Sequence, residues 1–506
     1  MPTDIGKIKK NTGETQAEKY LISLCQSTFL SMWCYPCIYN DKLLNQRNEG
    51  KEICDVFVAF ENHIIIFSDK NCSFNGEIAV NLAWKRWAKK ALFDSAAQIN
   101  GAERWLRDYP DRVFIDKKCT QRLPIHINLK EQKLHKILVT HGIDSFSKKY
   151  FHGGYGSLMV NTAIRGTLKH EENPFHIGYI AENNEYIHVF DDFTLPLLLT
   201  NLDTISDFIE YLEKKEELLS TRIVVACGEE DLLGHYLMNE RSFALPAKDF
   251  QLVSFEEDIW SDYVELLEKT TKKKDDEVSY FWDELITQFS KHIMEDTQYY
   301  IPNHTSSKFA DLENGLRELA RETRFARRIL SNSFIDFMSN NRFPTSQEGT
   351  GAYRATRLFC FEQRPERAYV FLILERKIEQ ESNLEYREKR MHLLRACCLI
   401  AKTRIPSATT IIGIATEQLD CEERSEDFLA LDATMWSEED ESEALKLQAE
   451  TRLLTTKIMM HAQVIEYQKR EKIRRNAPCS CGSGIKYKKC CGKNSEDKFE
   501  SCGSNV

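Results

Sequence analysis

Residues 55–70 read Asp55-Val56-Phe57-Val58-Ala59-Phe60-Glu61-Asn62-His63-Ile64-Ile65-Ile66-Phe67-Ser68-Asp69-Lys70. Two runs rich in β-branched and aromatic residues, 55–60 and 64–67, flank three polar residues, a pattern typical of a β-hairpin. Asp55 opens the first predicted strand, and Ser68, Asp69 and Lys70 end the second. Because side chains alternate along a strand, Ser68 and Lys70 are expected to share a face while Asp69 points away.

Helices are predicted on both sides of this hairpin. Apolar residues recur at helical spacing over 13–30, and again over a longer stretch, 83–108. Glu18 lies in the first predicted helix and Gln98 in the second. The N-terminal hundred residues therefore predict helix, hairpin and helix, with polar residues where the elements begin or end.

This arrangement, over roughly residues 12–108, resembles the PD-(D/E)XK nuclease superfamily, which has the restriction-endonuclease-like fold. The resemblance implies an acid in the first helix, an Asp on one strand and an (E/Q)-x-K motif on the next, with a Gln in the following helix of many members. Glu18, Asp55, Lys70 and Gln98 stand at these positions. Ser68 stands where the resemblance implies a second acid.

The resemblance implies a metal-dependent nuclease. Asp55 and Glu18 would hold Mg²⁺ or Mn²⁺, hard cations that prefer carboxylate oxygens. The metal would act as a Lewis acid, and Lys70 would orient or deprotonate the attacking water. Gln98 would position Lys70 or a phosphate oxygen.

Ser68 leaves three alternatives open. Glu18 supplies the missing carboxylate, Ser68 contributes its hydroxyl or carbonyl oxygen, or the site is catalytically inactive. In the last case the chain is a non-catalytic zinc-binding adaptor, with a degenerate nuclease fold that binds nucleic acid or protein.

The segment 84–90, Trp-Lys-Arg-Trp-Ala-Lys-Lys, alternates aromatic and basic residues. Such a pattern suits a nucleic-acid surface, because cations meet the phosphate backbone and aromatic rings stack on bases. The two tryptophans are expected in the core, which leaves Lys85 and Arg86 as the predicted nucleic-acid contacts.

Four cysteines near the C-terminus, Cys479, Cys481, Cys490 and Cys491, lie in a segment rich in Gly, Ser and Lys. With few apolar residues to form a core, this segment is expected to fold around a structural Zn²⁺ held by four thiolates. The segment resembles the SEC-C motif, the zinc knuckle at the C-terminus of the preprotein-translocase motor ATPase. The resemblance implies docking to a protein, and the surrounding basic residues also suit ribosome or nucleic acid. The alternative is a knuckle that only caps the last helix.

The order of predicted strands and helices indicates an α/β protein, and the chain length indicates a multidomain one. The chain has 506 residues, a net charge of −10 and 42% hydrophobic residues, which favours two or three domains. No apolar run is long enough to insert into a membrane, and no apolar segment near Met1 predicts a secretory signal. Most cysteines outside the knuckle stand singly in apolar stretches, which favours a reduced, cytoplasmic location.

Predicted domain boundaries follow the changes in pattern. We expect a restriction-endonuclease-like domain, two regions of unassigned role (one α/β, one helical and then α/β), a long helix, the SEC-C zinc motif and a disordered tail. They cover, in that order, 1–125, 126–250, 251–435, 436–473, 474–493 and 494–506.

The remaining elements are predicted from local periodicity. Strands are expected at 113–115, 125–129, 136–140, 175–179, 186–190, 221–226, 368–374 and 409–416. Helices are expected at 206–219, across 278–339, at 384–402 and from 436 to about 474. Cys34 and Cys37 form a Cys-x-x-Cys pair that we expect to be structural. The acidic pair Asp191-Asp192 is a metal-binding candidate or, as is usual at strand ends, a turn.

Overall fold

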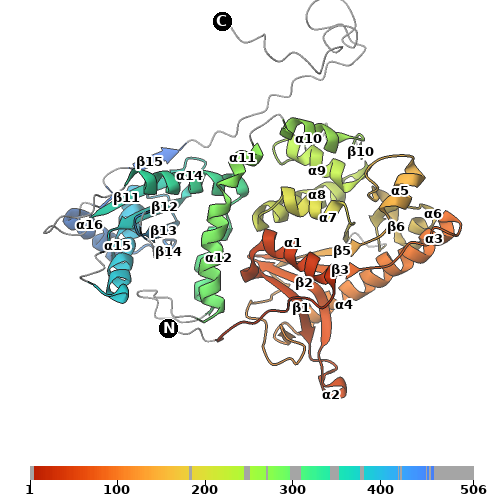
Figure 1. The fold of residues 1–506 in the computed structure, drawn as a ribbon, viewed down its shortest axis with the longest axis horizontal. Coiled ribbons are helices and arrows are strands. Elements are labelled where there is room, and N and C mark those ends of the chain that lie inside the picture. The colour runs from red at the N-terminus through yellow and green to blue at the C-terminus, as the bar shows by residue number, and fades with distance from the viewer. Residues whose placement is uncertain are drawn as a thin grey trace, which may run out of the picture. The chain divides into compact units, whose positions relative to one another are not determined.

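Three β-sheets with helices packed on them make up the computed structural model of the chain (Figure 1). It describes residues 5–460 except 182–184, 244–250, 269–271, 297–308, 342–352, 377–380, 420, 422–423, 452 and 455–456. All described residues belong to one compact unit, Met1–His461. The chain is of mixed α/β type with several sheets, which confirms this part of the sequence-based prediction.

The first sheet has six strands in the order β4-β1-β2-β3-β5-β8. Their bounds are β1 Cys34–Asn40, β2 Lys51–Phe60, β3 His63–Lys70, β4 Val113–Phe114, β5 Lys133–Thr140 and β8 His188–Phe190. β1, β2 and β3 pair antiparallel, whereas β3, β5 and β8 pair parallel. The parallel strands therefore end at one common edge of the sheet.

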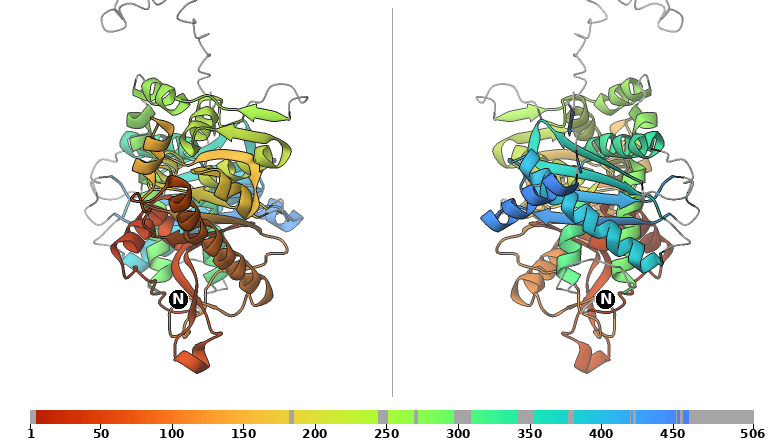
Figure 2. Two further views of the ribbon diagram at one scale, coloured as in Figure 1. Left: turned by 90° about the vertical axis from the view of Figure 1, so that its right-hand side faces the viewer. Right: turned by 90° about the vertical axis from the view of Figure 1, so that its left-hand side faces the viewer.

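The predicted hairpin is present as β2 and β3. Phe60 pairs with His63, so the turn contains two residues, one fewer than expected, and Glu61 takes a left-handed conformation with φ 54°. Both strands are apolar and buried along most of their length, as is typical of strands covered on both faces. β1, which the sequence did not predict, pairs along β2, and the two strands form an arm that ends in the short helix α2 (Leu44–Arg47) (Figures 1 and 2).

Helices α1 (Gln16–Trp33) and α4 (Ser95–Asp108) cover opposite faces of this sheet. Phe29 of α1 packs against Phe67 of β3. On β5, Lys136 pairs in register with Ile66, the residue before Phe67, and its ammonium contacts Asn100 and Glu103 of α4. Because neighbouring residues of a strand point to opposite faces, α1 and α4 lie on different sides.

The helix predicted over 83–108 has three parts. α3 (Val80–Ala88) leads into a π-helical turn, Lys89–Asp94, and then into α4. The Lys89–Asp94 ion pair spans five residues, and the Ser95 hydroxyl donates to the Lys90 carbonyl, also five residues away. Buried pairs recur every four residues at 83/84, 87/88, 91/92 and 95/96. A repeat of four exceeds the 3.6 residues of an α-turn, so the helix unwinds locally.

A second sheet has the order β10-β9-β6-β7. Its strands are β6 Met159–Arg165, β7 His176–Tyr179, β9 Ile223–Ala226 and β10 Leu252–Ser254. The helices of this part of the chain are α5 Asp144–Phe151, α6 Gly166–Glu172, α7 Thr194–Asn201, α8 Ile205–Thr221, α9 Glu229–Met238 and α10 Ile259–Glu268. The strand predicted at 125–129 is wrong. Asn128 accepts there from Lys130 N–H and donates its own N–H to the Gln132 side chain, which folds the segment into a turn.

A third sheet has the order β14-β13-β12-β11-β15, with bounds β11 Arg354–Phe361, β12 Arg364–Leu374, β13 Thr410–Thr416, β14 Glu426–Asp432 and β15 Lys457–Met460. The helices are α11 Lys272–Glu277, α12 Tyr280–Met294, α13 Phe309–Ala320, α14 Arg324–Asn340, α15 Asn383–Arg404 and α16 Glu438–Thr451. The helix predicted from 436 to 474 is wrong beyond Thr451. Residues 457–460 instead pair parallel with β11, and residues 461–474 lie outside the described part.

Candidate functional site

Asp55, Ser68 and Lys70 lie on one face of the β2–β3 pair. Val56 pairs with Phe67, so continuing the register places Asp55 opposite Ser68. The Asp55 carboxylate accepts the backbone N–H of Asp69 through Oδ2 at 2.8 Å. Lys70, two residues after Ser68, shares its face, which is the face that α4 covers. The hairpin thus brings together three of the five predicted catalytic residues.

Burial dominates the electrostatics of Asp55. It raises the pKa of this carboxyl to about 7, the Asp69 N–H opposes the shift, and the negative charges of Glu52, Asp69 and Glu18 add to it. Asp55 Oδ1 has no hydrogen-bond partner among the described residues. A half-buried carboxylate with a free oxygen and acidic neighbours attracts a cation, since a cation offsets both burial and repulsion.

Glu18 has a structural task at the start of α1. Its Oε2 accepts the N–H of Glu14 at 2.8 Å and of Thr15 at 3.4 Å, while the Thr15 hydroxyl accepts the N–H of Glu18. This is a capping box, which the spacing Thr15-x-x-Glu18 signals in the sequence. These backbone bonds lower the pKa of Glu18. Its charge acts on Asp55, but the carboxylate is already partly used by the helix.

Lys70 and Gln98 are placed differently. Lys70 is half-buried, forms no ion pair within the described part of the chain, and lies near enough to the Cys72 thiol to act on it together with Lys90. Gln98 is exposed on α4, between the buried residues Ala96 and Ile99. Its side chain makes no hydrogen bond to any described residue, so the geometry does not join Gln98 to Lys70.

The ends of the three parallel strands bring together Asp69, His141 and Asp192, of which the sequence pattern had marked only Asp192, as part of a possible metal-binding pair. The His141 ring contacts Asp69 Oδ1 through Nε2 at 2.6 Å and Asp192 Oδ1 through Nδ1. These bonds, that of Asp192 first, raise the pKa of His141 to about 10, so the ring is an imidazolium at neutral pH. Each residue lies at or just past the end of a predicted strand. Ligands bind at such carboxyl edges in open α/β sheets, and this signal was available in the sequence.

The two acids that follow β8, Asp191 and Asp192, therefore have different roles. Asp192 holds His141 and accepts the Gly142 N–H at 2.8 Å. Asp191 is buried and accepts the N–H groups of Leu158, Phe193 and Thr194. Asp191 is a turn residue, as is usual for acids at strand ends.

The basic side chains of the segment 84–90 are exposed. Lys85 forms an ion pair with Glu171 at 2.6 Å, which neutralises part of its charge. Arg86 is exposed and has no ion pair with the residues that the structure describes. Trp84 and Trp87 are buried and stacked on each other, so the expectation that they belong to the core is confirmed.

The predicted zinc ligands Cys479, Cys481, Cys490 and Cys491 lie outside the described residues. Cys34 and Cys37 are both buried, and burial raises the pKa of each thiol. None of the described helices combines the length and apolar character needed to cross a bilayer.

Comparison with known proteins identifies the C-terminal segment. Residues 475–493 match the SEC-C motif family. Protein translocase subunit SecA of Thermodesulfovibrio yellowstonii is 75% identical over 28 residues, and that of Carboxydothermus hydrogenoformans is 68% identical over 28. SecA of Aliarcobacter butzleri is 48% identical over 48 residues. These matches cover 6–10% of the chain and 3–5% of each SecA. No solved structure matches the chain.

Proposed function

We propose that the chain is a metal-dependent nucleic-acid hydrolase whose C-terminal SEC-C motif is a zinc-binding docking module. The observation that carries the proposal is the β2–β3 register, which sets Asp55 opposite Ser68 with Lys70 on the same face. A preceding helix with Glu18 and a following helix on this face occur in the order that a PD-(D/E)XK nuclease requires. Such an enzyme would serve defence against foreign nucleic acid or nucleic-acid processing, in the cytoplasm.

The residues present fit a Mg²⁺ or Mn²⁺ ion. Asp55 would offer Oδ1, a hard ligand of the kind these ions prefer. Glu18 belongs to α1, which covers the other face of the sheet, but its charge reaches Asp55, and its oxygen that does not cap α1 is proposed as the further ligand. The bound ion would supply Lewis-acid chemistry at the scissile phosphate. Lys70 would orient the attacking water and balance the negative charge that develops on the phosphate.

The placement of the other groups refines these roles. Arg86 is the better candidate for a phosphate contact, because Lys85 is paired with Glu171. His141, a cation at the same strand ends, adds positive charge close to Asp69. The Gln98 side chain makes no hydrogen bond to a described residue, so no catalytic role is proposed for it.

A second candidate function is a non-catalytic adaptor that binds nucleic acid or protein. Ser68 favours it, since this buried residue replaces the second carboxylate expected of the enzyme. The SEC-C motif suits either function. The proteins that share it here are subunits of a protein translocase, which supports a protein contact for this segment; a ribosome contact is the alternative.

The test is cleavage of single- and double-stranded DNA and RNA by the full chain in Mg²⁺ or Mn²⁺. Asp55→Asn and Lys70→Ala are compared with the controls Asp111→Asn and Lys130→Ala, which change exposed residues away from the site. We expect the first two to lower the cleavage rate by roughly 10²-fold or more and the controls to leave it unchanged.

Two results separate the candidates. Cleavage that persists in Asp55→Asn and Lys70→Ala assigns the activity to another site or a contaminant. Nucleic-acid binding without cleavage, equal in all five proteins, supports the adaptor.

A further inference from the structure

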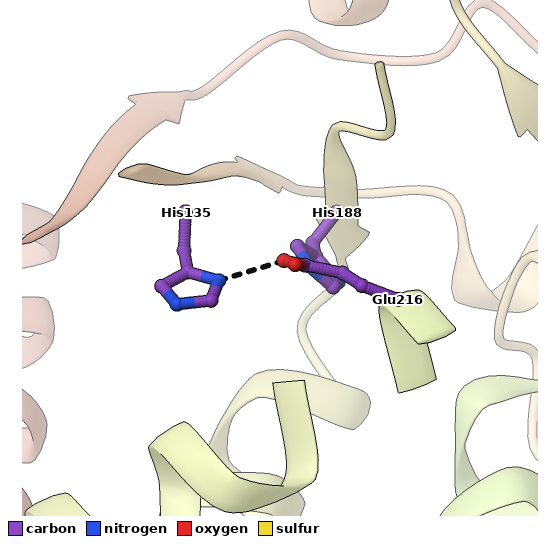
Figure 3. Close-up of side chains that lie close together, drawn as sticks. All are labelled: His135, His188 and Glu216. Atoms are coloured by element: carbon purple, nitrogen blue, oxygen red, sulfur yellow. Dashed lines mark hydrogen bonds and ion pairs between the residues drawn. The ribbon is translucent and has the colours of Figure 1, made fainter. Parts of the chain in front are cut away.

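A cluster of metal-binding side chains lies on the face of the first sheet opposite Asp55. His135 on β5, His188 on β8 and Glu216 on α8 offer two ring nitrogens and one carboxylate oxygen, all within 4.8 Å of one another (Figure 3). No other group of three or more His, Cys, Asp or Glu side chains in the described part of the chain is placed to hold a metal ion. We propose that it is a binding site for a divalent transition metal ion, Zn²⁺ foremost, that ties α8 to the edge of the sheet.

The sheet register fixes two of the three ligands. His188 pairs with Ile137, which lies two residues after His135 on β5, so both histidines point to the same face. Their side chains are 0% exposed, and the Glu216 side chain is 18% exposed. The site is thus preorganised by backbone pairing and is reached from the side of Glu216.

The donor atoms already converge on one point. Glu216 Oε1 lies 2.7 Å from His135 Nδ1 and 2.9 Å from His188 Nε2. Donors around a tetrahedral zinc ion stand about 3.3 Å apart, given bonds of about 2.0–2.1 Å. Moving Glu216 Oε1 roughly 0.5 Å farther from each of the two ring nitrogens would therefore make room for the ion. Two imidazoles and one carboxylate suit Zn²⁺ and its first-row neighbours better than Mg²⁺ or Ca²⁺.

Neighbouring groups orient these ligands. His135 Nε2 lies 3.1 Å from His63 Nδ1, and the two rings stack with their centroids 5.3 Å apart. When His135 Nε2–H donates in this bond, Nδ1 carries no proton and is available to a metal. Lys133 holds the other Glu216 oxygen, Oε2, at 2.8 Å, which leaves Oε1 as the ligand. The Nδ1 atom of His188 is buried and has no partner in the described structure, so protein hydrogen bonds do not fully satisfy this ring.

The test counts bound metal in the full chain with the C-terminal motif disabled. The parent carries Cys490→Ser and Cys491→Ser, so that zinc held by the motif is not counted. Glu216→Gln keeps the size and one carbonyl oxygen but is a poor ligand. Glu217→Gln, an exposed neighbour on the same helix, is the matched control. After loading with Zn²⁺ and removal of free ion, elemental analysis should give about one Zn²⁺ per chain in the parent and the control, and a loss of that ion in Glu216→Gln.

Two readouts guard against a folding artefact. Circular dichroism establishes that each variant is folded, and Co²⁺ loading of the parent should give a d–d absorption band without the thiolate charge-transfer band of a cysteine site. A parent that binds neither Zn²⁺ nor Co²⁺, or a folded Glu216→Gln that keeps the full metal content, overturns the proposal. The cluster would then be a hydrogen-bond network without a metal, in which both histidines donate to Glu216.

Discussion

Asp69 and Lys70 are neighbours in the chain, and their side chains lie on opposite faces of β3. Lys70 joins the face of Asp55 and Ser68, whereas the Asp69 carboxylate holds His141. The backbone N–H of Asp69 nevertheless binds Asp55. The catalytic candidates and the His141 pair are thus linked through one residue, and a change in either is expected to be felt by the other.

His141 predicts a pH dependence of stability. Its pKa of about 10 in the folded protein exceeds the usual value of 6.5, so its contribution is fully present below pH 6.5 and is lost as pH rises through 10. We expect the free energy of unfolding of the wild type to fall by roughly 2 kcal/mol over that interval relative to His141→Gln. Urea unfolding at pH 6, 8 and 10 measures it, with the exposed His126→Gln as control. Parallel pH curves for wild type and His141→Gln would contradict the assignment.

Ser68 predicts a coupling between charge and metal. Ser68→Glu buries a second carboxylate beside Asp55 and should lower the free energy of unfolding by about 1–3 kcal/mol in EDTA at pH 8. If the carboxylates bind Mg²⁺, the ion should restore most of this loss. Ser68→Gln, similar in size but uncharged, is the control for steric effects. Equal responses of the two variants to Mg²⁺ would show that no ion binds there.

At the scale of elements, the N-terminus of α1 combines capping with a proposed metal ligand, and two substitutions separate these roles. Thr15→Ala removes half of the capping box and should cost about 1 kcal/mol of stability, whereas Glu18→Gln keeps an amide oxygen that can cap the helix and should cost less. Only Glu18→Gln should also slow cleavage, by roughly tenfold or more, if Glu18 binds the metal. Thermal unfolding and cleavage rates of both variants provide the measurement. Equal losses of cleavage would reduce Glu18 to a cap.

Helix α15 and strand β14 are joined by a buried ion pair. Asp427 accepts from Arg390 at 2.7 Å and also pairs with Arg387, and both Asp427 and Arg390 are 0% exposed. Asp427→Asn leaves the buried Arg390 guanidinium with only the more distant Glu417 carboxylate, at 3.6 Å, and should cost about 3 kcal/mol. Asp432→Asn, on the exposed end of the same strand, should cost less than about 1 kcal/mol. Chemical denaturation compares the two, and similar losses would contradict this reading of the pair.

Elements with strong local patterns were predictable from sequence, and those defined by distant partners were not. The β2–β3 hairpin follows from its apolar runs, whereas β1 contains Pro36, which usually argues against a paired strand. Pro36 is tolerated because β4 pairs only with Tyr39 and Asn40 and leaves that edge of β1 free at Pro36. The shared face of Ser68 and Lys70 was predictable for the same local reason, whereas the position of Asp55 opposite Ser68 follows from a turn one residue shorter than predicted. His135, His188 and Glu216 come from three separate elements, and their spacing in the sequence does not predict that they lie close together.

At the scale of the whole molecule, the chain joins a large α/β unit to a short segment that matches a motif found in SecA. The shared segment is only 6–10% of the chain, so it informs on docking and not on the chemistry of the remainder. Activity and attachment are accordingly proposed for different parts of the chain.

This division predicts that zinc can be removed from the C-terminal motif by one substitution. Cys490→Ser should lower the zinc content by about one ion per chain, because a structural site needs all four ligands. Cys502→Ser, a cysteine beyond the matched segment, should leave the content unchanged. Elemental analysis of the purified full chains decides, and equal zinc in both variants would place the metal elsewhere.

The π-helical turn at Lys89–Asp94 determines which side of the following helix, α4, is buried. Each residue of an α-helix advances by about 100°, so a four-residue repeat drifts by about 40° each time and by about 120° over the three repeats from Trp84 to Ala96. The turn offsets this drift and keeps the buried pairs 83/84, 87/88, 91/92 and 95/96 on one side of the helix. It also decides that Gln98 faces solvent. Removing one residue from the turn would rotate α4 by about 100° about its own axis, which would move part of its buried side toward solvent without altering any other side chain.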